Sequence, residues 1–306
     1  MIVVGNVIVG GAGKTPTVIA LVSLLRSWGL HPGIVSRGHG RAGAAVQVLD
    51  AATAAAAATP AAFGDEPLLM HRRTAAPIAV ARRRGDAALR LLQAHPEVDV
   101  IVADDGLQHH ALARDVELVV FDGRGIGNGR PLPAGPLRED AAAIWPAASA
   151  GPPRFILVNG RWPAPPALAL PAPPERCFEA ARALGGAVAL DDWSRGGAAT
   201  LEGLHALRGR PVLAAAGIGD PERFFAMLEA EGLTVVRQPL PDHADFATLP
   251  WPAGTPDVIV TEKDAVKLAG RVRGRTRVWV ATLDFGLPDT LAAALRETLA
   301  RHGASA

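Results

Sequence analysis

Short apolar runs alternate with segments of helical periodicity near the start of the chain. Residues 2–4 form a β-branched run that ends in a glycine-rich turn, and from Lys14 to Trp28 apolar residues recur every three or four positions. Gly29 marks the end of this helix, and the apolar run 33–36 predicts the next strand. A strand, a glycine loop, a helix and a strand in succession predict a βαβ unit, which builds a parallel sheet.

The same alternation continues to residue 122. Apolar runs predict strands at 78–81, 98–103 and 117–121, and a helix at 86–94. Residues 42–62 are mostly alanine and have no clear periodicity, so we predict no element there. We therefore expect a doubly wound α/β domain over residues 1–160.

A change of composition follows this domain. Proline is so frequent from 163 to 174 that it removes backbone donors and interrupts helices, which predicts a linker or a sheet edge at 161–178. A second, smaller α/β domain is expected at 179–285. Residues 286–306 contain an amphipathic helix, which we expect to pack back on the first domain. The elements predicted in the second half are strands at 212–216, 234–237, 257–261 and 278–281, and helices at 221–231 and 291–299.

The glycine turn after the first strand has the composition of a phosphate-binding loop. Glycine lets backbone N–H groups turn toward a phosphate without a clash, and the following helix N-terminus adds partial positive charge. The lysine supplies a charge for the terminal phosphates, and the threonine hydroxyl is placed to hold Mg²⁺. Ile8 stands where the formal pattern requires glycine, so the alternative is a glycine-rich turn with an incidental lysine. The loop residues are Gly10, Gly11, Ala12, Gly13, Lys14 and Thr15.

A second part of such a site follows the apolar strand predicted at 98–103. Asp104 and Asp105 come directly after it, and P-loop proteins place the carboxylate on the Mg²⁺ side at the end of a buried strand. Acidic residues often end strands, so this pair alone is weak evidence for a Mg²⁺ site. The glycine loop earlier in the chain strengthens the prediction. We predict Thr15, Asp104 and Asp105 as the Mg²⁺ residues of a P-loop NTPase-like parallel sheet flanked by helices.

Bulk composition excludes some classes of protein. The formal net charge is +1, so nucleic acid is not expected as a partner. The single cysteine, Cys177, leaves no internal disulfide to form. Apolar runs are shorter than the roughly 18 residues that a membrane span needs.

Several short polar clusters, taken together and in order, resemble the tetraacyldisaccharide 4′-kinase family, the lipid A 4′-kinases of Gram-negative bacteria. The resemblance covers nearly the whole chain. The clusters are Val4-Gly5-Asn6, Ser36-Arg37-Gly38-His39-Gly40, Gly64-Asp65-Glu66-Pro67, Asp104-Asp105-Gly106-Leu107-Gln108-His109-His110, Leu132-Pro133-Ala134-Gly135-Pro136-Leu137-Arg138-Glu139, Pro241-Asp242-His243 and Thr261-Glu262-Lys263-Asp264-Ala265-Val266-Lys267.

The resemblance implies a reaction and a place. The family transfers the γ-phosphate of ATP, with Mg²⁺, to the 4′-hydroxyl of a tetraacylated glucosamine disaccharide 1-phosphate. We therefore expect peripheral contact with the cytoplasmic face of the inner membrane, and we favour a monomer. Family members usually carry several tens of residues before the first strand, including an apolar helix that dips into the membrane, and this sequence starts after them. It also departs from the family at Ile8, Ala12 and His39.

The family also suggests roles for individual side chains. Asp65 matches its catalytic aspartate, and His243 matches the partner that orients this aspartate or takes over the proton. Lys14 and Arg138 complete the predicted catalytic set. Asp65 could instead be a helix N-cap, and His243 a loop histidine without a task. If both act on one proton, they must face the same cleft as Lys14.

Five further residues are predicted on the substrate side. Arg84 matches a family arginine that would meet the anionic acceptor or the γ-phosphate. Adjacent histidines point apart on a helix and rarely share one ion, so His109 and His110 do not predict zinc. The predicted substrate residues are Arg37, Arg84, Gln108, His109 and Glu139.

Three alternatives stay open at this point. The chain could be a P-loop kinase of a soluble sugar or nucleoside, or a nucleotide switch that binds partners. The second is disfavoured because Thr261-Glu262-Lys263-Asp264 lacks the spacing of a GTPase base-reading motif. Ile8 and Ala12 raise a third alternative, an inactive paralogue.

Overall fold

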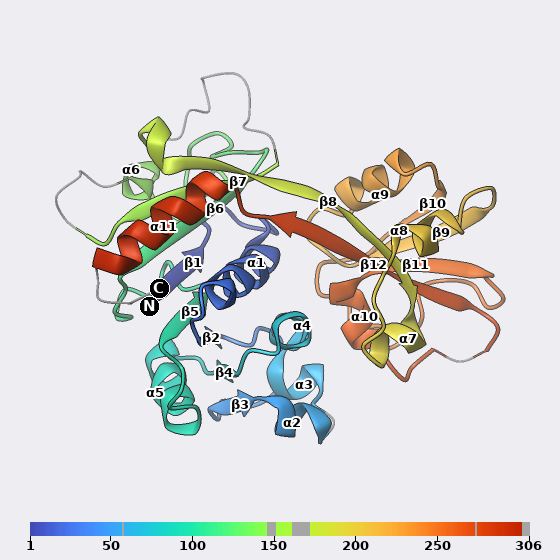
Figure 1. Ribbon diagram of the computed structural model, residues 1–306. Helices are drawn as coiled ribbons and strands as arrows, with labels where there is room; N and C mark the ends of the chain where they lie inside the picture. The colour runs from blue at the N-terminus through green and yellow to red at the C-terminus, as the bar shows by residue number, and fades with distance from the viewer. Residues whose placement is uncertain (57, 146–150, 161–171, 273, 302–306) are drawn as a thin grey trace. The chain divides into compact units, whose positions relative to one another are not determined.

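The computed structural model describes residues 1–56, 58–145, 151–160, 172–272 and 274–301. The chain divides into two compact units (Figure 1). Unit 1 comprises Met1–Ala181 and Phe285–Ala306, and unit 2 comprises Arg182–Asp284. The chain passes between them in two strands, β8 (Cys177–Ala189) and β12 (Arg277–Gly286).

Unit 1 is built on one sheet with the order β8-β7-β6-β1-β5-β2-β4-β3. Neighbouring strands from β8 to β4 pair in parallel, and β3 pairs with β4 in the antiparallel sense. β1 therefore lies between β5 and β6, and the carboxyl ends of these three strands share one edge of the sheet. The strands are β1 (Ile2–Gly5), β2 (Pro32–Ser36), β3 (Gln47–Leu49), β4 (Ile78–Val80), β5 (Val100–Asp104), β6 (Val116–Asp122) and β7 (Arg154–Asn159).

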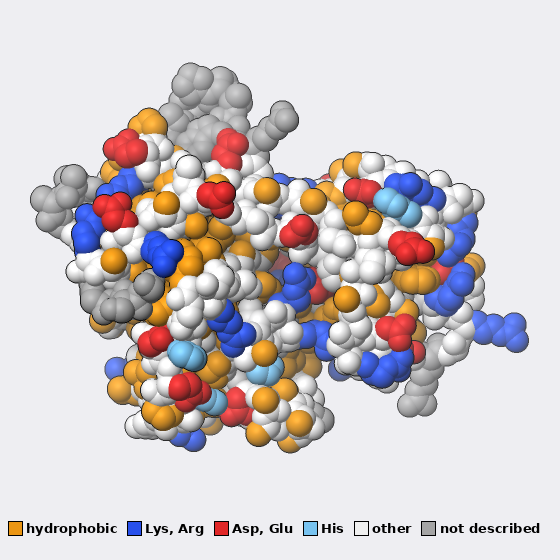
Figure 2. Space-filling view, viewed as in Figure 1, with side chains coloured by type: hydrophobic (Ala, Val, Ile, Leu, Met, Phe, Trp, Pro, Cys, Tyr) orange, Lys and Arg blue, Asp and Glu red, His pale blue; other side chains and the backbone are white. Residues whose placement is uncertain are grey.

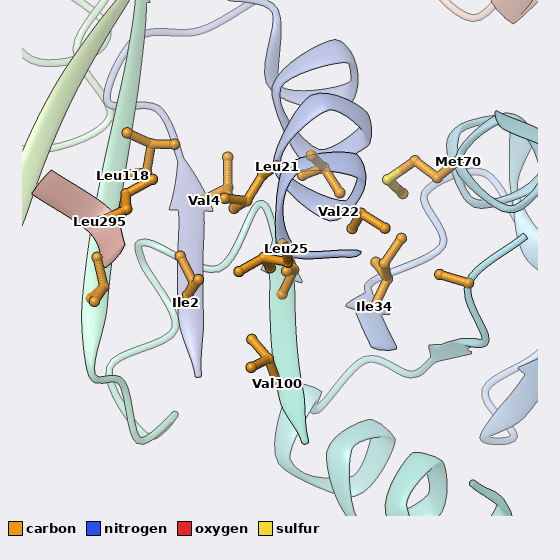
Figure 3. Packing of buried hydrophobic residues seen from close by; sticks show 14 of the residues in the cluster. Ile2, Val4, Leu21, Val22, Leu25, Ile34, Met70, Val100, Leu118 and Leu295 are labelled. Atoms are coloured by element: carbon orange, nitrogen blue, oxygen red, sulfur yellow. The ribbon is translucent and has the colours of Figure 1, made fainter. Parts of the chain in front are cut away.

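Two faces of this sheet are covered by helices. On one face α1 (Lys14–Ser27), α4 (Asp65–Thr74) and α11 (Asp289–Arg301) share a hydrophobic cluster with β1 and its neighbours (Figure 3). On the other face α5 (Arg84–Ala94) packs on Val3, Val35 and Ala103. The amphipathic C-terminal helix therefore shares the hydrophobic cluster of unit 1.

Several elements of unit 1 differ from the sequence prediction. Residues 42–62, where no element is expected, contain β3, α2 (Ala51–Ala55) and α3 (Pro60–Phe63). These are short elements, and tertiary contacts hold them, because Leu49 and Phe63 are buried in the main cluster. β7 and α4 were not predicted, and a short helix α6 (Ala141–Ile144) follows the loop after β6.

Unit 2 has a smaller sheet with the order β10-β9-β11-β12-β8. β9 pairs in parallel with β10 and β11, and β11 pairs in parallel with β12. Buried Leu204, Phe225 and Leu228 form the core of the unit with the strands. A 3₁₀ turn at Pro174–Arg176 precedes β8. The elements of unit 2 are α7 (Leu190–Ser194), α8 (Leu201–His205), β9 (Pro211–Ala216), α9 (Pro221–Ala230), β10 (Thr234–Pro239), β11 (Asp257–Thr261) and α10 (Glu262–Leu268).

The predicted linker at 161–178 is only partly described, since 161–171 lie outside the described residues. From 172 onward the chain belongs to unit 1 up to Ala181, so the division between the units falls within β8. Acidic and basic side chains are interspersed over the face shown in Figure 2, which fits the small net charge. Among the described helices, none combines the length and the apolar character needed to cross a membrane.

Candidate active site

The glycine loop lies between β1 and α1, as predicted. Gly13 has φ of 94° and is the N-cap of α1, so it adopts a left-handed conformation that suits glycine. A Cβ at Gly13 would lie 2.0 Å from Nδ2 of Asn159, at the end of β7. Asn159 Nδ2 also donates to the carbonyl of Ala12 at 3.3 Å. Both the backbone conformation and the close approach of Asn159 therefore require glycine at position 13.

Lys14 begins α1 and points back along the loop. Its Nζ donates to Oδ1 of Asn6 at 3.0 Å and lies 3.5 Å from Oδ1 of Asp105. Asn6 is buried, and its Nδ2 donates to the carbonyl of Ile8 at 2.6 Å. The ammonium group is thus held beside the loop, at the carboxyl ends of β1 and β5. Thr15 is the second residue of the helix and is half-buried.

Ile8 and Ala12, two of the positions that depart from the family, lie in the protein core. Ile8 is 1% exposed, and Ala12 is fully buried. Both belong to a hydrophobic cluster with Leu107 and Leu137 on the side of the sheet opposite α1. Ile8 also forms a β-bridge with Leu137. An apolar residue at these positions therefore fills a core site beneath the loop.

Asp104 ends β5 and is almost fully buried. Its Oδ2 accepts from Oγ of Ser36 at 2.9 Å, while its Oδ1 is buried with no hydrogen-bond partner among the described residues. Burial, together with the carboxylates of Glu66 and Asp105, raises the pKa of Asp104 to about 7. An acceptor oxygen without a donor beside other carboxylates is an environment that fits a bound cation.

Asp105 has a different environment from Asp104. Burial alone would raise its pKa, but Lys14, Arg138 and Arg84 outweigh burial and hold the pKa of Asp105 below its ordinary value. Arg138 NH1 lies 3.1 Å from Asp105 Oδ1, and Arg84 NH2 donates to the backbone carbonyl of Asp105 at 2.8 Å. Asp105 has φ of 48°, in the left-handed region. Asp105 therefore gathers three cationic side chains from α1, α5 and the loop after β6, two at its carboxylate and one at its backbone carbonyl.

The loop at 130–139 is joined directly to the glycine loop. The backbone N–H of Arg138 donates to the carbonyl of Val7 at 2.7 Å, and Val9 donates to the carbonyl of Pro136 at 2.9 Å. Gln108 Nε2 donates both to the carbonyl of Asn6 at 3.1 Å and to Oε1 of Glu139 at 3.0 Å. The predicted residues Gln108, Arg138 and Glu139 therefore lie together next to the glycine loop.

Other predicted residues of unit 1 border this cluster. Asp65 is buried and is the first residue of α4, and its Oδ1 accepts from the N–H of Glu66 at 3.0 Å. The N-cap of α4 is Gly64, so the alternative of Asp65 as N-cap is wrong. Arg37 is exposed and close enough to Arg84 to lower its pKa. Burial, followed by Arg84 and Arg114, lowers the pKa of His109.

His243 lies in unit 2, in the turn that follows β10. It has φ of 61°, and its Nε2 lies 3.3 Å from Nζ of Lys263 in α10. Asp65 belongs to unit 1. A shared cleft for Asp65 and His243 therefore stays a prediction.

Three side chains near the glycine loop were missed by the sequence analysis. Asp122 ends β6 and is buried, and it holds Arg124 with contacts of 2.7 to 3.1 Å. The Arg124 guanidinium faces Gly10, where a Cβ would lie 3.4 Å from NH1. Asn159 ends β7. The signal was available, because each of them ends or follows an apolar strand, as Asp104 does.

Comparisons with known proteins identify a family for this chain. A family model described as tetraacyldisaccharide-1-P 4'-kinase matches residues 1–300. The tetraacyldisaccharide 4'-kinase of Methylibium petroleiphilum is 56% identical over 305 residues, which cover 98% of this chain and 80% of the relative. The enzyme of the same name from Leptothrix cholodnii is 50% identical over 303 residues, covering 98% and 82%.

A solved structure supports the fold. A crystal structure of LpxK from Aquifex aeolicus in complex with ATP matches with a TM-score of 0.72 and 24% identity, covering 97% of this chain and 87% of that chain. At this identity the likeness shows the fold alone. It confirms the predicted α/β class with a P-loop kinase sheet flanked by helices.

Proposed function

The chain belongs to the tetraacyldisaccharide-1-P 4'-kinase family, and we propose that it uses the cluster around Lys14 and Asp105 to transfer the γ-phosphate of ATP to a lipid. The family identifies a kinase of lipid A biosynthesis that acts at a 4′ position. The proposed acceptor is the 4′-hydroxyl of a tetraacylated glucosamine disaccharide 1-phosphate. The observation that carries the proposal is the meeting of three cations at Asp105 beside the loop: Lys14 and Arg138 contact its carboxylate, and Arg84 donates to its backbone carbonyl.

The cationic side chains have a direct task in phosphoryl transfer. Negative charge accumulates on the transferring group and on the leaving oxygen, so donors that are already oriented lower the barrier. Asn6 and Asp105 hold Lys14 in place, and Asp105 also holds Arg138. The backbone N–H groups of residues 10–15 and the start of α1 would bind the phosphate chain of ATP. Gln108, His109, Glu139, Arg37 and Arg84 remain proposed as acceptor-side residues.

The residues predicted for Mg²⁺ fit that ion. Asp104 offers a buried oxygen without a donor, and Mg²⁺ commonly takes one or two carboxylates together with phosphate and water. We propose that Asp104, Asp105 and Thr15 hold it. When bound, the ion neutralises phosphate charge, and Asp104 would then be ionised.

Proton removal from the acceptor is assigned to Asp65 and His243. Asp65 is held at the start of α4 by its bond to Glu66, and His243 is held in a strained turn beside Lys263. The match of both residues to family motifs carries this assignment. We propose that Asp65 accepts the proton of the 4′-hydroxyl and that His243 orients Asp65 or takes the proton onward.

The pair is tested by single and double substitution. Asp65→Ala and His243→Ala should each lower kcat by about 10²-fold, because general base catalysis typically contributes about 10²–10⁴-fold. The double variant should cost little more than the worse single variant, as expected for residues that act as a unit. ATP affinity should change little, since the target is the acceptor. If the fold-losses in kcat of the two single variants multiply in the double variant, Asp65 and His243 act independently and the proposed pair is wrong.

The overall reaction is tested with a matched pair of acceptors. Incubation with ATP and the tetraacylated disaccharide 1-phosphate should give the 4′-phosphorylated lipid by mass spectrometry. The deacylated disaccharide 1-phosphate should react much more slowly. Equal use of both acceptors would favour the soluble-sugar alternative, and ATP hydrolysis without a phosphorylated acceptor would favour the nucleotide switch.

A lipid acceptor also requires access to a membrane surface. We propose peripheral contact at the cytoplasmic face of the inner membrane of a Gram-negative bacterium. Leu132 is 55% exposed in the loop that is bonded to the glycine loop, with exposed Pro131 and Pro133 beside it. An exposed apolar tip next to the phosphate site suits contact with acyl chains.

This contact can be measured by flotation with vesicles. Leu132→Asp should lower the fraction bound to vesicles of phosphatidylethanolamine and phosphatidylglycerol, because a charge at the tip opposes burial in lipid. Leu201→Asp is the matched control, since Leu201 is 47% exposed in unit 2. Equal binding of both variants and the parent chain would mean that another surface reaches the lipid.

A further inference from the structure

The turn that carries His243 is held by the backbone at the end of β9. Leu240 donates to the carbonyl of Ala216 at 3.0 Å, and His243 donates to the carbonyl of Gly217 at 3.3 Å. His243 has φ of 61°, which is uncommon for a residue with a side chain and costs conformational energy. Such a conformation persists only where its surroundings hold it, so the support of this turn is informative.

That support contains a buried carboxylate. Asp264 in α10 is fully buried, and its Oδ2 accepts from the N–H of Gly217 at 3.0 Å and from Oγ of Thr261 at 2.8 Å. Its Oδ1 lies 3.1 Å from Nζ of Lys267, which is also buried. Lys267 Nζ is in turn 5.2 Å from the ring centre of Phe246, three residues beyond His243. The motif from Thr261 to Lys267 thus contacts the Gly217 backbone, which binds the turn, and the ring of Phe246, which follows it.

Gly217 lies between this carboxylate and the turn. A Cβ at Gly217 would lie 3.0 Å from Oδ1 of Asp264, 3.2 Å from the carbonyl oxygen of Pro241 and 3.2 Å from Cβ of Ala244. Its φ lies outside the left-handed range, so the backbone itself would accept alanine. An alanine here would therefore press on the turn and on Asp264, and these neighbours would have to shift by a few tenths of an ångström.

The same helix also reaches the His243 ring. Lys263, the residue before Asp264, places Nζ 3.3 Å from Nε2 of His243 and 3.3 Å from Oδ1 of Asp242. An ammonium can donate only to a ring nitrogen that carries no proton. α10 therefore supports His243 twice, through its backbone with Asp264 and through its ring with Lys263.

We propose that Asp264, acting through the Gly217 peptide, is a positioning residue that sets the place and orientation of the His243 side chain. A buried ion pair is weak evidence for stability, because the desolvation of two charges offsets their attraction. The Asp264–Lys267 pair lies beside the turn that carries His243, so we assign it the task of holding that turn in position. This inference rests on the proposed role of His243 in proton transfer.

The test uses Gly217→Ala, which moves the turn without altering any charged group. Its kcat should fall by about tenfold with the KM for ATP unchanged, because misplacement by about 1 Å can cost up to about 10²-fold. Asp264→Asn should act in the same direction if it folds. Phe225→Leu is the control, since it loosens the core of unit 2 in α9. It should lower the melting temperature and leave kcat near that of the parent chain.

A double-mutant comparison separates positioning from general damage. In a His243→Ala background, Gly217→Ala should lower kcat by less than about twofold, because the side chain it positions is gone. A full tenfold loss in that background would overturn the inference and leave the role of His243 intact. A His243→Ala variant with normal kcat would remove the proposed role of His243, and the inference would fall with it.

Discussion

Replacing Lys14 with alanine is expected to lower kcat by about 10²–10³-fold, because a preoriented charge on the transferring phosphate is worth that much when it is removed. The fold should persist, since the Lys14 ammonium contacts Asn6 and Asp105 at the edge of the sheet and Lys14 is not part of the hydrophobic clusters. The measurements are steady-state turnover with saturating ATP, and circular dichroism for the fold. Affinity for ATP should also fall, by a smaller factor.

The matched control for this variant is Arg90→Ala. Arg90 is exposed on α5, away from the glycine loop, so its removal should leave kcat within about twofold, as is usual for surface substitutions. Near-normal turnover in Lys14→Ala would contradict the assignment of residues 10–15 as the phosphate-binding loop. A comparable loss in both variants would point to general damage.

Replacing Asp104 with asparagine is expected to act in opposite directions on activity and stability. Turnover should fall by about 10²–10³-fold, because the carboxylate proposed for Mg²⁺ is lost. Without nucleotide and Mg²⁺, the variant should be more stable at pH 8 by roughly 1–3 kcal/mol, since it no longer buries an ionised oxygen that lacks a partner.

The pH dependence has a definite sign. Folding raises the pKa of Asp104 from its ordinary value of 3.8 to about 7. Between these values the folded chain binds more protons at this site than the unfolded chain, so the contribution of Asp104 to stability falls as pH rises from about 4 to about 7. The stability difference between Asp104→Asn and the parent chain should grow over this range and level off above about pH 7.

Thermal melts at pH 5 and pH 8 would measure this difference. Asp122→Asn is the control, because Asp122 is a buried carboxylate at the end of β6 that is paired with Arg124. It should be less stable than the parent chain at both pH values, because it breaks an ion pair. An Asp104→Asn variant that melts below the parent chain at pH 8 would contradict the conclusion that the ionised Asp104 carboxylate destabilises the fold in the absence of Mg²⁺.

Much of the local architecture could be predicted from residue patterns. The helix predicted at 14–28 is α1 at Lys14–Ser27, and the strand predicted at 257–261 is β11. The apolar residues of the first recur at helical spacing, and the second is a short continuous apolar run, so each pattern favours one type of element. β8 was missed because its 13 residues contain several alanines and two glycines and show no strong apolar run. Its strand conformation comes from pairing with β7.

The candidate site also contains residues that local sequence predicts and properties that only the tertiary structure decides. Gly13, Lys14 and Thr15 are proposed from local sequence, because a glycine that permits a left-handed turn, followed by a helix start, suits phosphate binding by itself. Sequence also placed Asp104 and Asp105 at a strand end. It did not distinguish them, because their difference depends on burial and on charges brought by other segments.

Local sequence was thus sufficient for the glycine loop, for the main α/β pattern and for the motifs that carry the family resemblance. Tertiary structure alone distinguished Asp104, with a raised pKa and an unpartnered oxygen, from Asp105, which gathers Lys14, Arg84 and Arg138. It also turned Ile8 toward the core. The physical reason is that parallel pairing brings the carboxyl ends of β1, β5 and β6 to one edge. Residues about a hundred positions apart then share a single electrostatic environment.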